Sequence, residues 1–385
     1  MSNAGTVRPL GSQPRPSPRE PPRRRWMVLS SLAIVLFLIL IAGNPSSESK
    51  PSAISVPPLP PEPPLSAATI LVPKEPVAKP LDDIVTGFRG TLVMTVGGSG
   101  GTEVWRWSSG PDGTIARSLP VADIYDAMPD PSGSWILGLR RSGREPPLLQ
   151  MGIENDPAPV FWWTRSFAWH VATPGRVAWA AQRNAGAVAT VHVGERVEAG
   201  IYFKPATTLK GFELVAGTDR LVAFDDFGFV FERWAADRSS VSVQRIGPTG
   251  EPEGLVVGQF VGISPDGMVA VLDGPITRLL TGPSLEESAV ISSRYTSVVW
   301  APHSARFAAS NFETDSVDLA DGSARRTVAV GDIGPTILAW SSDGRFVLVS
   351  GELEEKPVIV FIDAVTLGTW TVRLDSYPVA ATVIP

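Results

Sequence analysis

The architecture of this chain follows from one stretch, Ser264-Pro265-Asp266-Gly267-Met268-Val269-Ala270-Val271. In such a stretch proline presets the backbone φ angle, aspartate hydrogen-bonds the neighbouring backbone, and glycine accepts a left-handed conformation. Apolar residues with a high preference for extended structure come directly after the glycine. The stretch therefore predicts a tight turn that leads straight into a β-strand.

Weaker copies of this phrase recur along most of the chain, and each is preceded by a short apolar strand. The turn residues that mark the copies are 42, 44, 48, 38 and 39 residues apart. A period of about 40–45 residues with four short strands per repeat is the signature of a propeller blade. The marker residues are Gly133, Gly175, Asp219, Gly267, Ala305 and Gly344.

The two ends of the repeat region complement each other. Residues 377–384 form a strand pattern where the innermost strand of a further blade would stand, but its turn and second strand do not follow. Near the N-terminal end of the repeat region, Gly90 and residues 91–96 supply a turn and a second strand at the position that the repeat period predicts. A closed ring leaves no open sheet edge. The predicted fold is an all-β, seven-bladed β-propeller in which the N- and C-terminal segments share one blade.

One transmembrane helix and a Pro-rich linker are expected to precede this propeller. Residues 1–25, with six arginines and one acid, are predicted to be a disordered basic cytoplasmic tail. Residues 26–43 are an uncharged run that is long enough to span a bilayer as a helix. Residues 44–86 are interpreted as a polyproline II stalk, with docking of a Pro-recognising partner as the alternative. The β-propeller domain is predicted over 87–385.

The arginines before residue 26 place the N-terminus in the cytoplasm and the propeller outside it, by the positive-inside rule. A cleaved signal peptide is the alternative, although its apolar region is usually only about 7–15 residues long. The predicted localisation is therefore the cell membrane, with a single pass. The residues expected to anchor the helix are Trp26, Leu29, Ile34, Leu36, Phe37 and Leu40.

Composition excludes several functional classes. The formal net charge of −6 divides into +5 for residues 1–25 and −11 for the rest, and an acidic body argues against nucleic acid as a partner. The absence of cysteine excludes disulfides, thiolate metal sites and cysteine nucleophiles. The three histidines, His170, His192 and His303, lack metal-ligand spacing, so no metal and no cofactor is predicted.

Two further patterns have structural interpretations. Residues 97–101 match Gly-x-Ser-x-Gly, but a strand follows where a nucleophile elbow requires a helix, so a hairpin is predicted. An aromatic cluster over residues 161–169 predicts packing between blades, with a platform for stacking sugars or peptides as the alternative.

The phrase Trp340–Phe346, with its relatives at Ser264–Gly267 and Trp300–Pro302, resembles the blade repeats of TolB-like and WD-repeat propellers. The resemblance covers about residues 87–385 and implies the fold. It implies no single function, because propellers of this type host binding, scaffolding and catalysis alike.

Charged residues in the loops expected between second and third strands predict a binding surface on one face of the ring. Early blades contribute basic residues and later blades acidic ones, an arrangement that would orient a partner of complementary charge. Ordinary surface solubility is the alternative. The predicted partner-binding residues are Arg140, Arg141, Arg144, Arg183, Asp225, Asp226, Glu313 and Asp315.

These patterns together predict a membrane-anchored, extracytoplasmic propeller that acts as a non-catalytic binding or scaffolding module of the cell envelope. The expected partners are the membrane and another envelope protein or a small ligand. The alternative is a propeller enzyme, a polysaccharide hydrolase or lyase that uses carboxylates in the central cleft. The sequence carries no signal for the oligomeric state.

Overall fold

The structure is a computed structural model. It describes residues 80–385 except 99, 111–112, 114, 141–147, 152–157, 162–163, 183–187, 198–199, 213, 216–217, 303, 312 and 322–323. The predicted tail, the predicted transmembrane helix and the linker as far as residue 79 lie outside the described residues. Within the described part, no helix is both long and apolar enough to cross a membrane.

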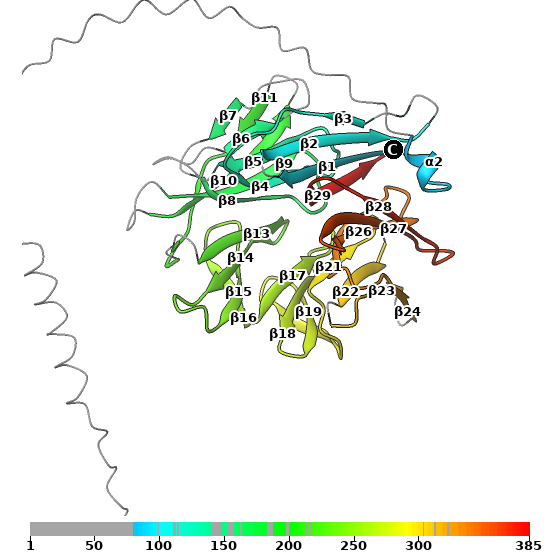
Figure 1. The fold of residues 1–385 in the computed structure, drawn as a ribbon. Coiled ribbons are helices and arrows are strands. Elements are labelled where there is room, and N and C mark those ends of the chain that lie inside the picture. Colours follow the sequence, from blue (N-terminus) through cyan, green and yellow to red (C-terminus); the bar gives the residue numbers. More distant parts are fainter. Residues whose placement is uncertain are drawn as a thin grey trace, which may run out of the picture. The chain divides into compact units, whose positions relative to one another are not determined.

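The described strands form seven separate antiparallel sheets that follow one another along the chain (Figure 1). Short segments rich in β-branched and aromatic residues favour this arrangement, since such residues pack well on a pleated surface. The first blade contains β4 (Ile124–Pro129), β5 (Ile136–Arg140), β6 (Leu148–Met151) and β7 (Ala158–Phe161). The second contains β8 (Thr164–Trp169), β9 (Arg176–Ala181), β10 (Thr190–Val197) and β11 (Gly200–Phe203), with β12 (Thr207–Thr208) also paired to β10.

The next four blades repeat the same four-strand order. The third contains β13 (Asp219–Asp225), β14 (Gly228–Trp234), β15 (Val241–Ile246) and β16 (Pro252–Val257). The fourth contains β17 (Gln259–Ile263), β18 (Val269–Asp273), β19 (Ile276–Thr281) and β20 (Glu286–Ile291). The fifth contains β21 (Ser297–Trp300), β22 (Phe307–Asn311), β23 (Ser316–Asp321) and β24 (Ala324–Ala329). The sixth contains β25 (Thr336–Trp340), β26 (Phe346–Leu353), β27 (Lys356–Asp363) and β28 (Thr369–Arg373).

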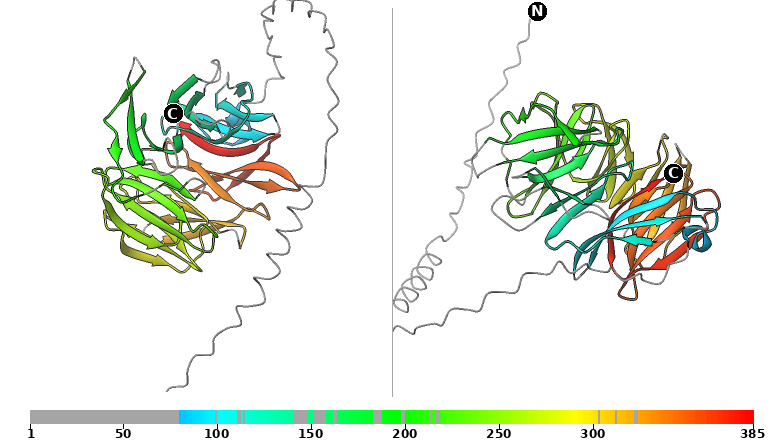
Figure 2. Two further views of the ribbon diagram at one scale, coloured as in Figure 1. Left: turned by 90° about the vertical axis from the view of Figure 1, so that its left-hand side faces the viewer. Right: turned by 90° about the horizontal axis from the view of Figure 1, so that it is seen from above.

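The closing blade joins the two ends of the ring and confirms the predicted sharing. Its strand order is β29 (Tyr377–Ile384), β1 (Thr91–Gly98), β2 (Gly101–Ser108) and β3 (Ile115–Arg117). Strands β29 and β1 are antiparallel, with Leu92 opposite Val383. Figure 2 shows β29, in red, lying along the blue and cyan strands of this blade. The seven-bladed, all-β propeller predicted from the repeat is therefore confirmed.

One repeat marker was assigned to the wrong strand. Asp219 was expected in the turn before a second strand, but it begins β13, the first strand of the third blade. The first-to-second turn of that blade is formed by Asp226 and Phe227, between β13 and β14. An additional segment from Lys204 to Thr218, which includes β12, separates the second and third blades and shifts the phase. Spacing alone did not reveal this shift.

Residues before the predicted start of the propeller belong to its packed core. The short helix α2 (Leu81–Ile84) leads to Val85 and Phe88. The side chains of Leu81, Val85 and Phe88 are at most 1% exposed. The Phe88 ring centroid lies 5.4 Å from that of Phe346 and 5.5 Å from that of Phe361, both in the sixth blade. Leu81 and Val85, which lie within the stretch predicted as linker, are therefore packed residues of the propeller.

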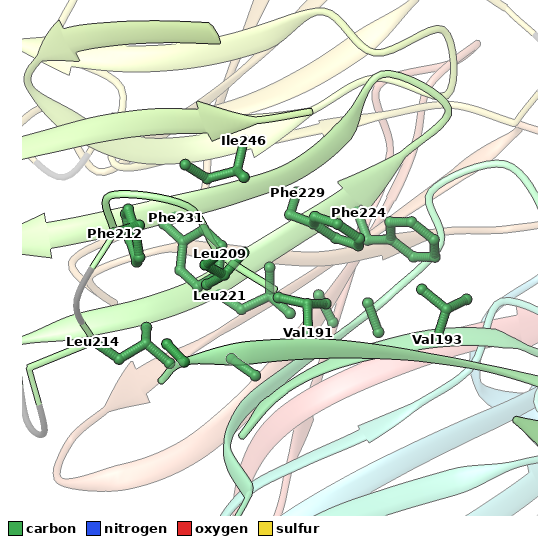
Figure 3. Close-up of a cluster of buried hydrophobic side chains, with 14 residues drawn as sticks. Val191, Val193, Leu209, Phe212, Leu214, Leu221, Phe224, Phe229, Phe231 and Ile246 are labelled. Atoms are coloured by element: carbon green, nitrogen blue, oxygen red, sulfur yellow. The ribbon is translucent and has the colours of Figure 1, made fainter. Parts of the chain in front are cut away.

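The hydrophobic core is divided among the interfaces between neighbouring blades. Figure 3 shows one of these clusters, which brings Val191 of the second blade together with Leu221 and Phe231 of the third. Phe224 and Phe229 stack with their ring centroids 5.3 Å apart. Full burial of one such side chain stabilises the fold by about 1.5–3 kcal/mol. Each blade therefore depends on its neighbours for stability.

Six of the seven innermost strands contain a register irregularity, in β4, β8, β13, β17, β25 and β29. The additional residue is Arg165 in β8, Val222 in β13 and Leu338 in β25. A bulge increases the local twist and changes the direction of the side chains around it. The direction of side chains on the innermost strands consequently departs from simple alternation.

The turn at Ser264–Gly267 joins β17 to β18 within the fourth blade and also contacts the third blade. Gly267 has a φ of 84°, and its amide donates to the Ser264 carbonyl oxygen at 3.0 Å. Its own carbonyl oxygen accepts a hydrogen bond from Arg245 Nη2 of the preceding blade at 3.1 Å. A similar bond joins Arg306 to the Gly344 carbonyl oxygen, also at 3.1 Å. The turn chemistry recognised in the sequence is thus also an inter-blade contact.

Candidate functional site

The strand order defines two faces of the ring. We call the face that carries the turns between first and second strands, such as those at Gly133 and Gly267, the turn face. The opposite face carries the loops between second and third strands, including that after Arg140, and we call it the loop face. Antiparallel neighbours reverse the chain at alternate ends of a blade, so these two sets of connections lie on opposite faces.

Part of the predicted binding surface lies on the loop face. Arg140 ends β5, and Glu313 and Asp315 occupy the loop between β22 and β23. Glu313 accepts a hydrogen bond from Arg294 at 2.6 Å, and Asp315 accepts one from the Gly334 amide at 3.2 Å. The other three basic residues of the prediction lie outside the described residues; they are Arg141, Arg144 and Arg183.

The structure does not place Asp225 and Asp226 with them. Both lie on the turn face, because the shifted phase makes β13 a first strand rather than a second one. Asp225 is only 3% exposed, and both of its carboxylate oxygens accept hydrogen bonds from Arg245 Nη1 at 2.8 Å. Its assignment to a partner-binding surface was wrong, because a buried, paired carboxylate cannot contact a partner. Asp226 is exposed and lies 3.2 Å from His170 Nε2.

The aromatic cluster packs between strands where it is described. Phe167 is 1% exposed, and the Trp169 indole donates to the Met128 carbonyl oxygen at 3.1 Å. The Phe161 ring centroid lies 5.0 Å from that of Trp179. These contacts match the packing interpretation for the three residues. Trp162 and Trp163 lie outside the described residues.

Three of the hollows that the described residues form open on the loop face. Two of them, of 560 and 740 Å³, share the exposed side chain of Tyr377 at the start of β29. The third has a volume of 390 Å³ and lies where β4, β8 and β13 begin. We call it the Arg220 hollow, and its charged lining residues are Asp126, Arg165, Asp219, Arg220, Glu232 and Arg238.

An ion pair joins two blades at the Arg220 hollow. Nη2 of Arg220 donates to both carboxylate oxygens of Asp126, at 2.9 and 2.8 Å. Burial raises the pKa of Asp126 above its ordinary value, against the lowering effect of the Arg220 guanidinium. Neither residue was predicted from the sequence. The only available signal was a charged residue near the start of an otherwise apolar innermost strand.

The hollow between the sixth and closing blades is acidic. Its lining includes Asp332, Glu352, Glu354 and Glu355. The Tyr377 hydroxyl donates to Glu352 at 2.9 Å, and this hydrogen bond raises the pKa of Tyr377. The acidic hollow therefore carries an excess of negative charge, whereas the Arg220 hollow contains three carboxylates and three guanidinium groups.

Among the described residues, no group of three or more His, Asp or Glu side chains could hold a metal ion. His170 accepts hydrogen bonds at Nδ1 from the amides of Ala172 and Thr173, at 3.2 and 3.0 Å. These bonds require a neutral ring protonated at Nε2. Burial and the nearby Arg176 lower the pKa of His170, while Asp226 opposes them. This histidine therefore has a structural role in the turn after β8.

The Gly-rich stretch connects two strands, as expected. Strand β1 ends at Gly98 and β2 begins at Gly101, with these two residues opposite each other in the ladder. A hairpin provides no helix N-terminus behind residue 99, which a nucleophile elbow requires.

Comparisons with known proteins find similarity only at the level of solved structures. No protein-family model and no curated protein matches the chain. TolB from Acinetobacter baumannii is similar, with 10% identity, a TM-score of 0.42, and coverage of 77% of this chain and 67% of its own. AztD from Citrobacter koseri has 14% identity and a TM-score of 0.47, covering 76% and 97% of the respective chains. The dihydro-heme d1 dehydrogenase NirN has 12% identity and a TM-score of 0.48, covering 77% and 75%.

All three TM-scores are below 0.5, so these likenesses carry no argument about this chain. The identities are too low to transfer an activity, and propellers as a class carry unrelated functions. The assignment of the fold rests on the strand order of the seven sheets.

Proposed function

We propose that this protein is a non-catalytic binding or scaffolding module of the cell envelope. Residues 26–43 would anchor it in the membrane, with the N-terminus in the cytoplasm and the propeller outside. The observation that carries the binding function is the convergence of three hollows on the loop face, which also carries the described loop charges. Concave surfaces of this kind are where proteins most often hold ligands and partner side chains.

The charges on the loop face support a partner that docks in one orientation. Arg140 comes from the first blade, and Arg141 and Arg144 follow it in the sequence, whereas Glu352, Glu355 and Asp375 lie in or next to the sixth and closing blades. Complementary charges accelerate encounter and exclude wrong orientations, even where they add little to affinity. A partner with one acidic and one basic region would fit this distribution.

The test combines crosslinking with charge reversals on the loop face and on the turn face. The full-length chain with an affinity tag would be crosslinked in its own membranes, and the bound proteins would be identified by mass spectrometry. Replacing Arg140, Arg141 and Arg144 by Glu should reduce the recovery of a stoichiometric partner at least tenfold. The control is Arg89→Glu, because Arg89 is exposed and precedes β1 at the turn face. Equal recovery with both variants would refute docking through the loop face.

One observation favours the enzymatic alternative. The Arg220 hollow contains three carboxylates, and the pKa of one of them, Asp126, is raised as a general acid requires. Both oxygens of Asp126 are already bound by Arg220, however, which opposes a catalytic role. Depolymerisation of an acidic polysaccharide by the wild type, and its loss in Asp126→Asn, would establish the enzyme and displace the binding function.

A further inference from the structure

We propose that the Arg220 hollow binds a small organic oxyanion, a molecule that carries a carboxylate or a phosphate. This inference rests on the proposed binding function and adds the chemical class of a ligand. The volume of 390 Å³ lies within the range of about 300–1,000 Å³ that is typical of small-molecule sites. Its walls come from the beginnings of β4, β8 and β13 and from the end of β14.

The carboxylates in the hollow already have hydrogen-bond donors from the protein. Asp126 accepts from Arg220, as described above. Asp219 accepts from Arg233 Nε and Nη2 at 3.3 and 3.2 Å, and from the Val215 amide at 3.0 Å. Glu232 accepts from the Trp234 indole at 2.9 Å and from the Phe260 amide at 3.0 Å. Each oxygen of the three lining carboxylates therefore accepts at least one hydrogen bond from the protein.

The guanidinium groups of Arg220 and Arg238 have N–H donors that can bind a ligand. An arginine side chain carries five N–H donors. Only Nη2 of Arg220 has a hydrogen-bond partner among the described residues, and this side chain is 55% exposed. Arg238 is exposed at the edge of the hollow, and the neighbouring carboxylate of Asp237 is bound by Ser239. The remaining N–H donors of Arg220 favour an anionic acceptor, and guanidinium groups match carboxylates and phosphates well.

The rest of the hollow holds these donors in place. Asp126 has a side chain that is only 11% exposed, and it fixes the Nη2 end of Arg220. Arg165 is the bulged residue of β8, and it donates from Nη2 to the Gln182 carbonyl oxygen at 3.3 Å. Trp234 is tied to Glu232 and adds an apolar wall. Such preorganisation lowers the ordering cost that a ligand would otherwise incur on binding.

The inference is tested by isothermal titration calorimetry of the detergent-solubilised, full-length chain. The two anionic probes are D-galacturonate and glycerol 3-phosphate, and their neutral counterparts are D-galactose and glycerol. We expect at least one anion to bind at least tenfold more tightly than its counterpart. Tighter binding of D-galacturonate identifies the ligand group as a carboxylate, and tighter binding of glycerol 3-phosphate identifies it as a phosphate. Absence of binding by both anions, or equal binding of the neutral molecules, would overturn the inference.

Two variants of hollow residues and one control variant test whether the anion binds in this hollow. Arg238→Gln changes an exposed turn and should weaken binding about tenfold, the effect of losing one charged hydrogen bond. The double variant Asp126→Asn with Arg220→Gln removes the Arg220 donors without leaving a lone buried charge. Arg89→Gln is the control and should bind as the wild type does. Wild-type affinity in both hollow variants would overturn the assignment, whatever the outcome of the crosslinking experiment.

Discussion

Replacing Arg245 by methionine should destabilise the propeller strongly. The Arg245 side chain is fully buried, and it donates two hydrogen bonds to Asp225 and one to the Gly267 carbonyl oxygen. Arg245→Met removes these donors and leaves a buried carboxylate without its counter-charge. Removal of one partner from a buried ion pair costs about 3–5 kcal/mol. Burial raises the pKa of Asp225 and the Arg245 charge opposes this rise, so Arg245→Met should raise that pKa further, and easier proton uptake limits the loss.

This cost corresponds to a measurable change in melting temperature. An unfolding entropy of about 2.1 cal/mol/K per residue over roughly 300 residues gives about 0.6 kcal/mol/K. A loss of about 4 kcal/mol therefore lowers Tm by about 6 °C. The assay is thermal unfolding of the full-length chain, followed by circular dichroism. Arg89→Met, at an exposed position, is the control and should stay within about 0.5 kcal/mol of the wild type.

A double variant separates the effect of the unpaired charge from the effect of lost volume. Replacing Asp225 by Leu and Arg245 by Met together removes both charges and keeps most of the apolar packing. Such replacements are often neutral or stabilising, so the double variant should recover at least half of the lost Tm. The Gly267 carbonyl oxygen would still lack its donor, which keeps the recovery incomplete. A single variant that melts like the wild type, or a double variant no better than the single one, would refute this reasoning.

Three further predictions concern closure, the N-terminal segment and pH. Deletion of residues 376–385 removes β29 and exposes the edge of β1, so Tm should fall and aggregation on heating should rise; unchanged melting would contradict closure through this blade. Phe88→Ala should cost about 3–5 kcal/mol in urea unfolding, whereas a residue in a free linker would cost almost nothing. The pKa of His170 is lowered in the folded state, so the unfolded chain takes up its proton first as pH falls. Stability should therefore decline as pH falls below about 6.5, and the slope should be smaller in His170→Gln; equal slopes would show that another group is responsible.

The sequence was sufficient to predict the architecture because the signals that specify a blade are local. A turn such as Ser264–Gly267 and the short apolar strands beside it can be recognised within about ten residues. Their repetition then gave the number of blades, and the phase at the two ends gave the shared one. The same reasoning failed at Asp219, because the segment before β13 has no turn phrase to reveal its additional length.

The surroundings of individual side chains depend on residues distant in the sequence. Asp225 looked like a charged loop residue until the fold placed Arg245 against it in the interior. Phe88 lies just inside the predicted propeller, and the side chains on which it packs are more than 250 residues away in the chain. Burial and pairing arise from such juxtapositions, which a local pattern does not contain.

The Arg220 hollow illustrates the same division. Its two central residues are 94 positions apart, on strands of different blades, and meet only because the ring brings β4 and β13 together. The turn phrases set the chain direction and the spacing of blades, since φ preferences and strand propensities act within a few residues. The positions of charges, hollows and buried pairs were set by packing across the ring, where free energy depends on which distant groups share a low-dielectric environment.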